Sequence, residues 1–475
     1  MAVKENREKN FAKNTFIISL GTVLPKFTSF ITLPILTGRL TTAEYGTHDL
    51  ITTLVSLFLP MVTLQIQSAA FRFLIDRRND KKEVDRVITN IIAYIVPVSL
   101  AALVILFFVL QNLTAEIRFL ICVYFFVDIL LKAAQQIVRG LSNNKLYSAS
   151  SILHSILNML FLILFVSVAD RGLEGVLAAS TLSIVAGILL LTIRSGMLKH
   201  IHISLVSGSL LKEMLSYSWP LVPNSLSLWA LKMSDRLVIT FFLGVEANAM
   251  YSVANKIPSL LNTLQSTFSL AWQENASLAV KDNDSSAYYT HMFDEMFCIL
   301  SGVTALLIAA TPILFWLLIN SKYNDAYVQM PILFLGMLFS CLSSFMGGIY
   351  IAHKKTKSVG IMTVVAAGIN LLIDLLLVNV VGIFAGSIST LAAYLFLTIE
   401  RMIGATRLED IHYNIKKILL LLAVLCLMSG LCWINTLPGN ILNIVIGTVF
   451  TCATNWQIVK LLFQMIRKKV FRKEA

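Results

Sequence analysis

The sequence predicts an all-α polytopic membrane protein with about fourteen transmembrane helices, and three observations carry this prediction. Of its 475 residues, 57% are hydrophobic and only 13% are charged. The mean hydropathy is +0.78, which lies far outside the composition of soluble globular proteins. The apolar residues are also gathered in segments of roughly 20, the length of helix that crosses the hydrocarbon core of a bilayer.

The apolar segments follow one another along the whole chain. The first has an apolar run of about 22 residues without an A-x-A-like cleavage site, so we expect an uncleaved span rather than a signal peptide. The predicted spans are 15–38, 47–71, 87–110, 117–138, 146–169, 173–193, 214–243, 247–272, 292–319, 327–352, 358–378, 383–400, 418–434 and 441–459.

The distribution of basic residues predicts how these spans are oriented. Cytoplasmic loops carry an excess of Lys and Arg. The connections on one side hold most of the 38 Lys and Arg residues, whereas those on the other side hold Arg39, Arg118, Arg171 and Lys322. We therefore expect both termini in the cytoplasm. We attribute most of the net charge of +12 to this asymmetry, and the basic tail "RKKVFRK" to attraction by anionic membrane lipids. Neither feature requires a nucleic acid as a partner.

A weak internal repeat predicts two related halves. The pairs of similar segments are "LTTAEYGTHDL" from Leu40 with "LGVEANAMYSV" from Leu243, "ILNMLFLILFV" from Ile156 with "GINLLIDLLLV" from Gly368, and "GLEGVLAASTLS" from Gly172 with "GIFAGSISTLAA" from Gly382. The second pair superposes Asn158 on Asn370. Their common order is typical of transporters built from two repeats. We expect a six-helix lobe at 1–193, a cytoplasmic linker at 194–213, a second six-helix lobe at 214–405, and two extra helices with a basic tail at 406–475, the two lobes surrounding a central cavity.

The segment 214–243 is unusual because it carries Lys232, Asp235 and Arg236 near its middle. Each charge costs about 2.5–3.5 kcal/mol at the centre of a membrane helix. Ser225, Trp229, Lys232 and Arg236 fall on one helical face. Two interpretations remain open at this point: a structural pair of Lys232 with Asp235, or a water-filled cavity lined by cations.

Basic residues exceed acidic ones among the charges inside or at the ends of the spans. Such residues usually face a bundle interior or an aqueous path. A cavity rich in Lys and Arg suits an anionic substrate, for which phosphate or pyrophosphate is the natural candidate. The candidate substrate-binding residues are Lys26, Arg72, Lys232, Arg236 and Lys256. Asp235 and Asp374 are the candidate residues for charge pairing or for coupling to an ion.

The motifs of common enzymes are missing from the sequence. It contains no GxxxxGK[ST], HExxH or GxSxG pattern, and its seven histidines are scattered. We therefore expect no enzymatic activity, no catalytic residue, no metal and no cofactor. The connections between spans are also too short for a catalytic domain.

Several segments together resemble the Wzx-type flippases, the polysaccharide transporters of the multidrug/oligosaccharidyl-lipid/polysaccharide exporter superfamily. They are "LGTVLPKFTSFITLPILTGRLTTAEYGTHDL", "AAFRFLID", "VRGLSNNKLYSASSILHSILN", "WPLVPNSLSLWALKMSDRLVITFFLG" and "YSVANKIPSLLNTLQSTFSLAWQENA". The candidate cations and Asp235 occupy charged positions of these motifs. Asp374 departs from the family pattern, in which Asn is expected.

The resemblance implies a function in polysaccharide synthesis. Such a protein flips an undecaprenyl-pyrophosphate-linked oligosaccharide repeat unit from the inner to the outer leaflet of a bacterial plasma membrane, for capsule, exopolysaccharide or O-antigen. It works by alternating access through a cationic lumen. Its implied partners are the lipid-linked anionic oligosaccharide, a proton or sodium ion, membrane lipids, and the polysaccharide polymerase and assembly proteins.

Three alternatives stay open. One is a multidrug or toxin extrusion antiporter, whose usual cationic substrates favour an acidic lumen instead. Another is a flippase for the peptidoglycan lipid precursor, which also carries pyrophosphate. The most remote is a membrane-bound polysaccharide polymerase or glycosyltransferase, against which the short loops argue.

Overall fold

The computed structural model describes residues 2–111, 113–280, 284–456 and 460, and the secondary structure within these ranges is helical, with no strand. This confirms the predicted all-α fold class. The basic tail predicted after residue 460 lies outside the described residues. The chain forms two compact units, Met1–Met233 (unit 1) and Ser234–Ala475 (unit 2), and each is described by itself.

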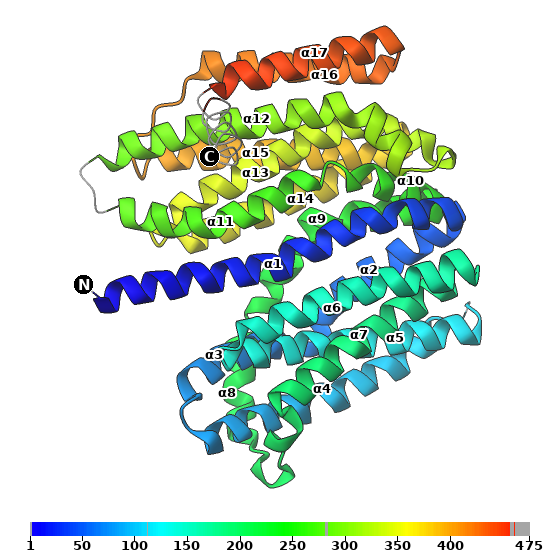
Figure 1. Ribbon diagram of the computed structural model, residues 1–475, viewed down its shortest axis with the longest axis vertical. Coiled ribbons are helices and arrows are strands. Elements are labelled where there is room, and N and C mark those ends of the chain that lie inside the picture. The colour runs from blue at the N-terminus through cyan, green and yellow to red at the C-terminus, as the bar shows by residue number, and fades with distance from the viewer. Residues whose placement is uncertain (1, 112, 281–283, 457–459, 461–475) are drawn as a thin grey trace, which may run out of the picture. The chain divides into compact units, whose positions relative to one another are not determined.

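Unit 1 contains the first helices of the chain. These are α1 (Ala2–Arg39), α2 (Thr42–Thr63), α3 (Ile66–Arg77), α4 (Lys81–Val109), α5 (Ala115–Gly140), α6 (Asn144–Leu162), η1 (Ile163–Val168), α7 (Gly172–Ser195), η2 (Met197–His200), η3 (Ile203–Leu205), α8 (Gly208–Ser218) and the first part of α9 (Leu221–Leu243). Within this unit, α6 packs against α1 and α7, and α5 packs against α7 (Figure 1).

Unit 2 contains the remaining helices. These are the rest of α9, α10 (Val245–Lys256), α11 (Leu260–Ala279), α12 (Ser285–Leu318), η4 (Ser321–Gln329), α13 (Met330–Ala352), α14 (Thr356–Val381), α15 (Phe384–Thr406), α16 (Ile415–Ile434) and α17 (Leu437–Thr454). The division between the units falls inside α9, beyond the predicted linker. The predicted boundaries of the lobes stay a prediction.

Ten helices in the described part of the chain are long and apolar enough to cross a membrane, or eleven if the bent pair α2–α3 forms one span. They coincide with eleven of the predicted spans. The other three predicted spans fall on α5, α9 and the pair α10–α11. Each of these three carries charged side chains, such as Lys132, Lys232 and Lys256. Their crossing of the membrane stays a prediction.

A bend of 56° separates α2 from α3. Leu64 and Gln65 lie at the break with φ of 46° and 59°, in the left-handed region that non-glycine residues rarely adopt. The side chain of Gln65 holds this arrangement, because its Oε1 accepts hydrogen bonds from Ser68 Oγ at 3.0 Å and from Gln67 Nε2 at 3.2 Å. Gln65, Gln67 and Ser68, at and just after the break, line a cavity of unit 1.

The connection between α7 and α8, where we predicted a linker, is fixed to α4 by side chains. Asn90 is fully buried. Its Oδ1 accepts a hydrogen bond from the Ser207 backbone N–H at 2.8 Å, and its Nδ2 donates to the Leu205 carbonyl at 3.0 Å. Asp85 accepts from His200 Nδ1 at 2.5 Å. Side chains thus satisfy backbone groups that this irregular segment leaves without helical partners.

We expect Asn90→Ala to destabilise the protein. The substitution leaves two backbone groups without partners, and each such loss costs about 1–3 kcal/mol. The unfolding temperature of the detergent-purified protein should fall by several degrees, whereas Asn79→Ala, at an exposed position, should leave it unchanged. Equal unfolding temperatures for the two variants would show that these hydrogen bonds do not hold the connection.

In unit 2, α16 and α17 lie side by side against α12 (Figure 1). Gly302 of α12 permits a close approach, since a Cβ at this position would lie 2.6 Å from Asn455 Nδ2. Asn455 Nδ2 donates to the Cys298 carbonyl at 3.1 Å. Small residues with interhelical hydrogen bonds are a common way of joining helices in membranes, where burial of apolar surface contributes little.

The connections of unit 2 are joined by Glu409, which follows α15. Its carboxylate accepts hydrogen bonds from Ser285 Oγ at 2.9 Å, Ser286 Oγ at 3.0 Å and His353 Nε2 at 3.0 Å. Burial alone would raise the pKa of Glu409, but these hydrogen bonds and the nearby imidazole outweigh it and lower the pKa below its ordinary value. The carboxylate thus links the starts or ends of α12, α13 and α15.

Candidate functional site

The charged stripe predicted on 214–243 falls on α9 and carries polar contacts at its first two positions. Ser225 Oγ accepts a hydrogen bond from Gln65 Nε2 at 2.9 Å. Trp229 Nε1 donates to Ser56 Oγ at 3.0 Å. Both contacts lie within unit 1, so this part of the stripe packs against α2 and the α2–α3 break.

Lys232 and Arg236 lie four residues apart on α9, which places them on the same helical face. Lys232 is exposed, and its ammonium makes no ion pair among the residues that the structure describes. Arg236 is partly buried. A cation without a counter-ion at this point in a predicted span is available for an anionic ligand.

The other predicted cations have different surroundings. In unit 1, Lys26 is exposed on α1 and its charge interacts with that of Lys232. Arg72 on α3 forms an exposed ion pair with Asp76, with 2.7 Å between the guanidinium and carboxylate atoms. Lys256 of unit 2 is the last residue of α10, where a cation interacts favourably with the helix dipole.

Asp235 is 2% exposed and is held by hydroxyl groups of unit 2. One carboxylate oxygen accepts hydrogen bonds from Tyr251 Oη at 2.5 Å and from Thr390 Oγ1 at 2.7 Å. Its other oxygen has no hydrogen-bond partner within the described ranges. Asp235 is therefore held by neutral groups, and its charge is not balanced by an ion pair with Lys232.

Asp374 on α14 is fully buried and lies within interaction range of Asp235. Neither of its carboxylate oxygens has a hydrogen-bond partner in the part of the chain that is described. Beside it, Asn370 Oδ1 accepts from Ser234 Oγ at 3.0 Å, and its Nδ2 donates to Ser389 Oγ at 3.3 Å. The structure thus brings together the two acids that the sequence singled out, although they are 139 positions apart in the numbering.

Two buried carboxylates close together repel each other, and keeping both charged in this position is costly even with the Arg236 guanidinium next to Asp235 in the chain. They need a shared proton or a bound cation. Carboxylate, amide and hydroxyl oxygens are the ligands that hard cations prefer. The cluster formed by Asp235, Asp374, Asn370, Tyr251 and Thr390, called here the acidic cluster, supplies all three kinds of oxygen.

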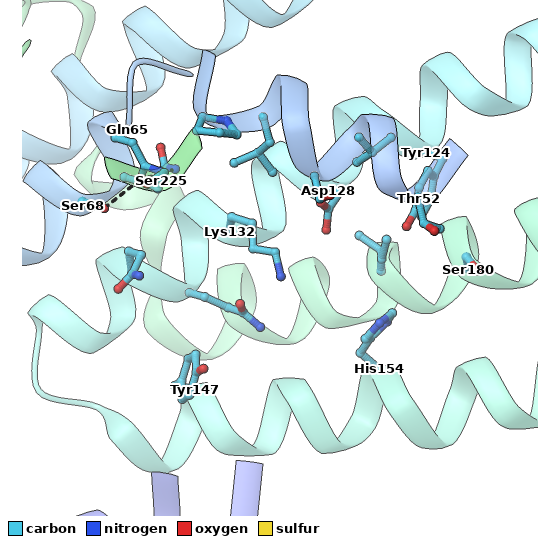
Figure 2. A pocket seen from close by; sticks show the side chains of 18 of the residues that line it. Thr52, Gln65, Ser68, Tyr124, Asp128, Lys132, Tyr147, His154, Ser180 and Ser225 are labelled. Carbon is cyan, nitrogen blue, oxygen red and sulfur yellow. Dashed lines mark hydrogen bonds between the residues drawn. The ribbon is translucent and has the colours of Figure 1, made fainter. Parts of the chain in front are cut away.

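Unit 1 contains a polar cavity of about 660 Å³ that the sequence did not predict. Most of its lining is neutral and polar. The side chains that line it are those of Thr52, Val55, Ser56, Leu59, Pro60, Gln65, Gln67, Ser68, Tyr124, Asp128, Lys132, Gln135, Gln136, Tyr147, His154, Asn158, Ser180, Ile184 and Ser225. Figure 2 shows Asp128, Lys132, Tyr147 and His154 projecting into the same space.

The two units contain a similar local contact made by the two asparagines that the repeat superposes. Asn158 on α6 donates to Ser180 on α7 at 3.3 Å. Asn370 on α14 donates to Ser389 on α15 at the same distance. Both serines begin the tripeptide Ser-Thr-Leu. This contact supports the internal repeat, and it lies beside the cavity in unit 1 and in the acidic cluster in unit 2.

The fold and the apolar character of its helices define a class: a multi-pass α-helical membrane protein. The fold is similar to that of the lipid II flippase MurJ in its inward closed conformation, with a TM-score of 0.70 and 14% identity, covering 94% of this chain and 100% of that one. It is also similar to an inward-facing multidrug resistance MATE family transporter of the MOP superfamily, with a TM-score of 0.63 and 15% identity, covering 81% and 98%.

The particular family follows from the sequence match. The model of the family described as "Polysaccharide biosynthesis protein" matches residues 11–272. The chain belongs to this family. No curated protein matches the chain by sequence. The family match confirms the resemblance to a family of polysaccharide biosynthesis, and the solved structures show that the chain shares its fold with MurJ and with a MATE transporter of the MOP superfamily.

Proposed function

We propose that this protein flips an undecaprenyl-pyrophosphate-linked oligosaccharide from the inner to the outer leaflet of a bacterial plasma membrane, with both termini in the cytoplasm. The observation that carries the proposal is Lys232, an exposed ammonium without an ion pair among the described residues, placed within a predicted span. With Arg236 one helical turn away, it offers two positive charges to a pyrophosphate.

The physical task fits this arrangement. A flippase must move a doubly charged pyrophosphate and many sugar hydroxyls through about 30 Å of hydrocarbon, while the polyprenyl tail can stay in lipid. Charge-assisted hydrogen bonds from Lys232 and Arg236 would replace part of the water lost by the phosphates. Lys26, Arg72 and Lys256 are further proposed contacts. To bind phosphate, Arg72 would first have to open its ion pair with Asp76.

We assign coupling to an ion gradient to the acidic cluster. Asp235 and Asp374 are both buried, and the oxygens of Asp374 lack hydrogen-bond partners in the described ranges. A proton or a sodium ion would balance their charge, and its binding or release would favour one of two states in an alternating-access cycle. The polymerase and the assembly proteins are proposed partners that remove the flipped product.

A second candidate function is flipping of the peptidoglycan lipid precursor, which is favoured by the similarity to the lipid II flippase MurJ over 94% of this chain. Both substrates carry a pyrophosphate, so the proposed cations do not distinguish them. The difference lies in the groups attached to the pyrophosphate.

Transfer between leaflets tests the proposal. The purified full-length protein is reconstituted into liposomes that contain fluorescent undecaprenyl-pyrophosphate-linked oligosaccharide, prepared from the cells that produce this protein. We expect the fraction that an external quencher reaches to rise above that in protein-free liposomes. Faster transfer of fluorescent lipid II would support the second candidate, and transport of ethidium without either lipid would support a multidrug extruder.

A further inference from the structure

The cavity of unit 1 has a lining suited to a neutral, strongly hydrogen-bonding ligand. Its volume of about 660 Å³ lies within the usual range of ligand pockets, but such pockets are mostly apolar. Here the aliphatic lining is limited to Val55, Leu59, Pro60 and Ile184, and the remaining lining residues carry hydroxyl, amide, imidazole or charged groups. An apolar ligand would leave these polar groups without partners.

Several polar side chains that line this cavity have functional groups without a hydrogen-bond or ion-pair partner among the described residues. The Tyr124 and Tyr147 hydroxyls, the Asp128 carboxylate and the Lys132 ammonium have no hydrogen-bond or ion-pair partner among the residues described. Gln67 is 6% exposed, and its Oε1 also lacks a partner there. Leaving such groups unsatisfied costs free energy, so water or ligand hydroxyls must satisfy them.

Other lining groups are already held in place. Gln65 bonds to Ser225, and Asn158 bonds to Ser180. These contacts fix the walls through side chains from the α2–α3 break, α9, α6 and α7. The cavity therefore combines a preformed frame with free donors and acceptors, which limits the cost of ordering on binding.

The charges in the cavity distinguish between ligand classes. Apart from His154, the lining contains one acidic residue, Asp128, and one basic residue, Lys132. The lining therefore has no net positive charge to match a pyrophosphate. A site for an organic cation would be expected to contain more acidic residues than Asp128 alone and more aromatic surface than two tyrosines. A saccharide matches better, because its hydroxyls donate and accept, and its ring faces pack against aromatic side chains.

We infer that this cavity binds the sugar residues of the lipid-linked substrate. The inference rests on the proposed function and deepens it: the sugars occupy the cavity of unit 1, while the cations of α9 hold the pyrophosphate. Tyr124, Tyr147, Asp128 and Lys132 contribute the hydrogen bonds that recognise the sugar, and Gln67 supplies an additional acceptor.

Binding of separate parts of the substrate tests this inference. The full-length protein in nanodiscs is titrated with two probes: undecaprenyl pyrophosphate without sugar, and the oligosaccharide released by mild acid from the lipid-linked fraction of the cells that produce the protein. The test variant is Tyr124→Phe with Tyr147→Phe, which removes two hydroxyls and little else. Its control is Tyr94→Phe on α4, outside the cavity lining.

We expect the double variant to bind the released oligosaccharide about tenfold more weakly, as expected from the loss of two hydrogen bonds. Its binding of undecaprenyl pyrophosphate and its unfolding temperature should match those of the wild type, and Tyr94→Phe should bind both probes normally. Asp128→Asn should likewise weaken binding of the released oligosaccharide alone.

Three results would overturn the inference. The wild type does not bind the released oligosaccharide, or the double variant binds it as well as the wild type does. The third is that the double variant loses ethidium binding instead. None of these results decides the proposed function, which the flipping assay tests separately. Conversely, cavity-dependent binding of the oligosaccharide without flipping of the intact lipid would refute the proposed function and retain the sugar site.

Discussion

Lys232→Ala is expected to lower flipping of the lipid-linked oligosaccharide by about tenfold or more, since a charge-assisted hydrogen bond is worth about 1.5–3 kcal/mol. The abundance of the variant in the membrane should stay nearly normal, because the Lys232 side chain is exposed and makes no ion pair among the described residues. Arg236→Ala should have a similar effect on flipping. Lys232→Arg should retain part of the activity, because it keeps the charge and alters the geometry. The measurements are leaflet transfer in liposomes and protein abundance in membranes.

Lys145→Ala is the matched control, since Lys145 is exposed at the start of α6. It should flip normally. The double variant Lys232→Ala, Asp235→Ala addresses the structural interpretation of the stripe. Because Tyr251 and Thr390 hold Asp235, removing both charges should not restore flipping. Full recovery in the double variant would refute a role for Lys232 in binding pyrophosphate.

Asp374→Asn is expected to abolish the dependence of flipping on the ion gradient and to slow flipping at least about tenfold, a loss equivalent to 1.4 kcal/mol. The substitution removes one of two buried carboxylates and leaves a side chain of nearly the same shape. The unfolding temperature should not fall, because neither oxygen of Asp374 has a hydrogen-bond partner in the described ranges and the variant buries no charge there.

The measurement compares liposomes with intact and with collapsed sodium or proton gradients. Sodium binding is checked separately, since a ligand that binds the folded state raises the unfolding temperature. Sodium chloride should stabilise the wild type more than choline chloride if sodium is the ion, and this difference should vanish in Asp374→Asn. Asp325→Asn, at an exposed position of unit 2, should behave as the wild type. Flipping by the wild type that is indifferent to both gradients would exclude coupling at this cluster.

Much of the fold could be predicted from the sequence because long apolar segments dictate helices in a bilayer. The bend at Leu64 and Gln65 was not predicted. Neither residue is Gly or Pro, and the break depends on side-chain contacts such as that from Ser68 to Gln65. The pattern of hydropathy does not report such contacts.

The candidate sites were predictable where charge marked them. Asp235 and Asp374 stand out within apolar segments, and the structure places them together. The hydroxyl groups that donate to Asp235, those of Tyr251 and Thr390, were not predicted because Tyr and Thr are common in membrane helices. The cavity of unit 1 was missed for the same reason: neutral side chains such as Gln67 carry no charge signal, although several Gln within apolar segments were a visible clue.

The paired contact of Asn158 with Ser180 and of Asn370 with Ser389 bears on how such a protein evolves. The superposition that aligns the two asparagines places Leu162 opposite Asp374, four residues further on. The two halves of the predicted repeat thus share a similar Asn–Ser contact, while the residues next to it differ. On the assignments proposed above, recognition of the sugar lies in unit 1 and coupling to the ion gradient lies in unit 2, so the two properties depend on different residues. Selection for a new sugar would act on unit 1 and selection for a new driving force on unit 2, so each property changes without loss of the other.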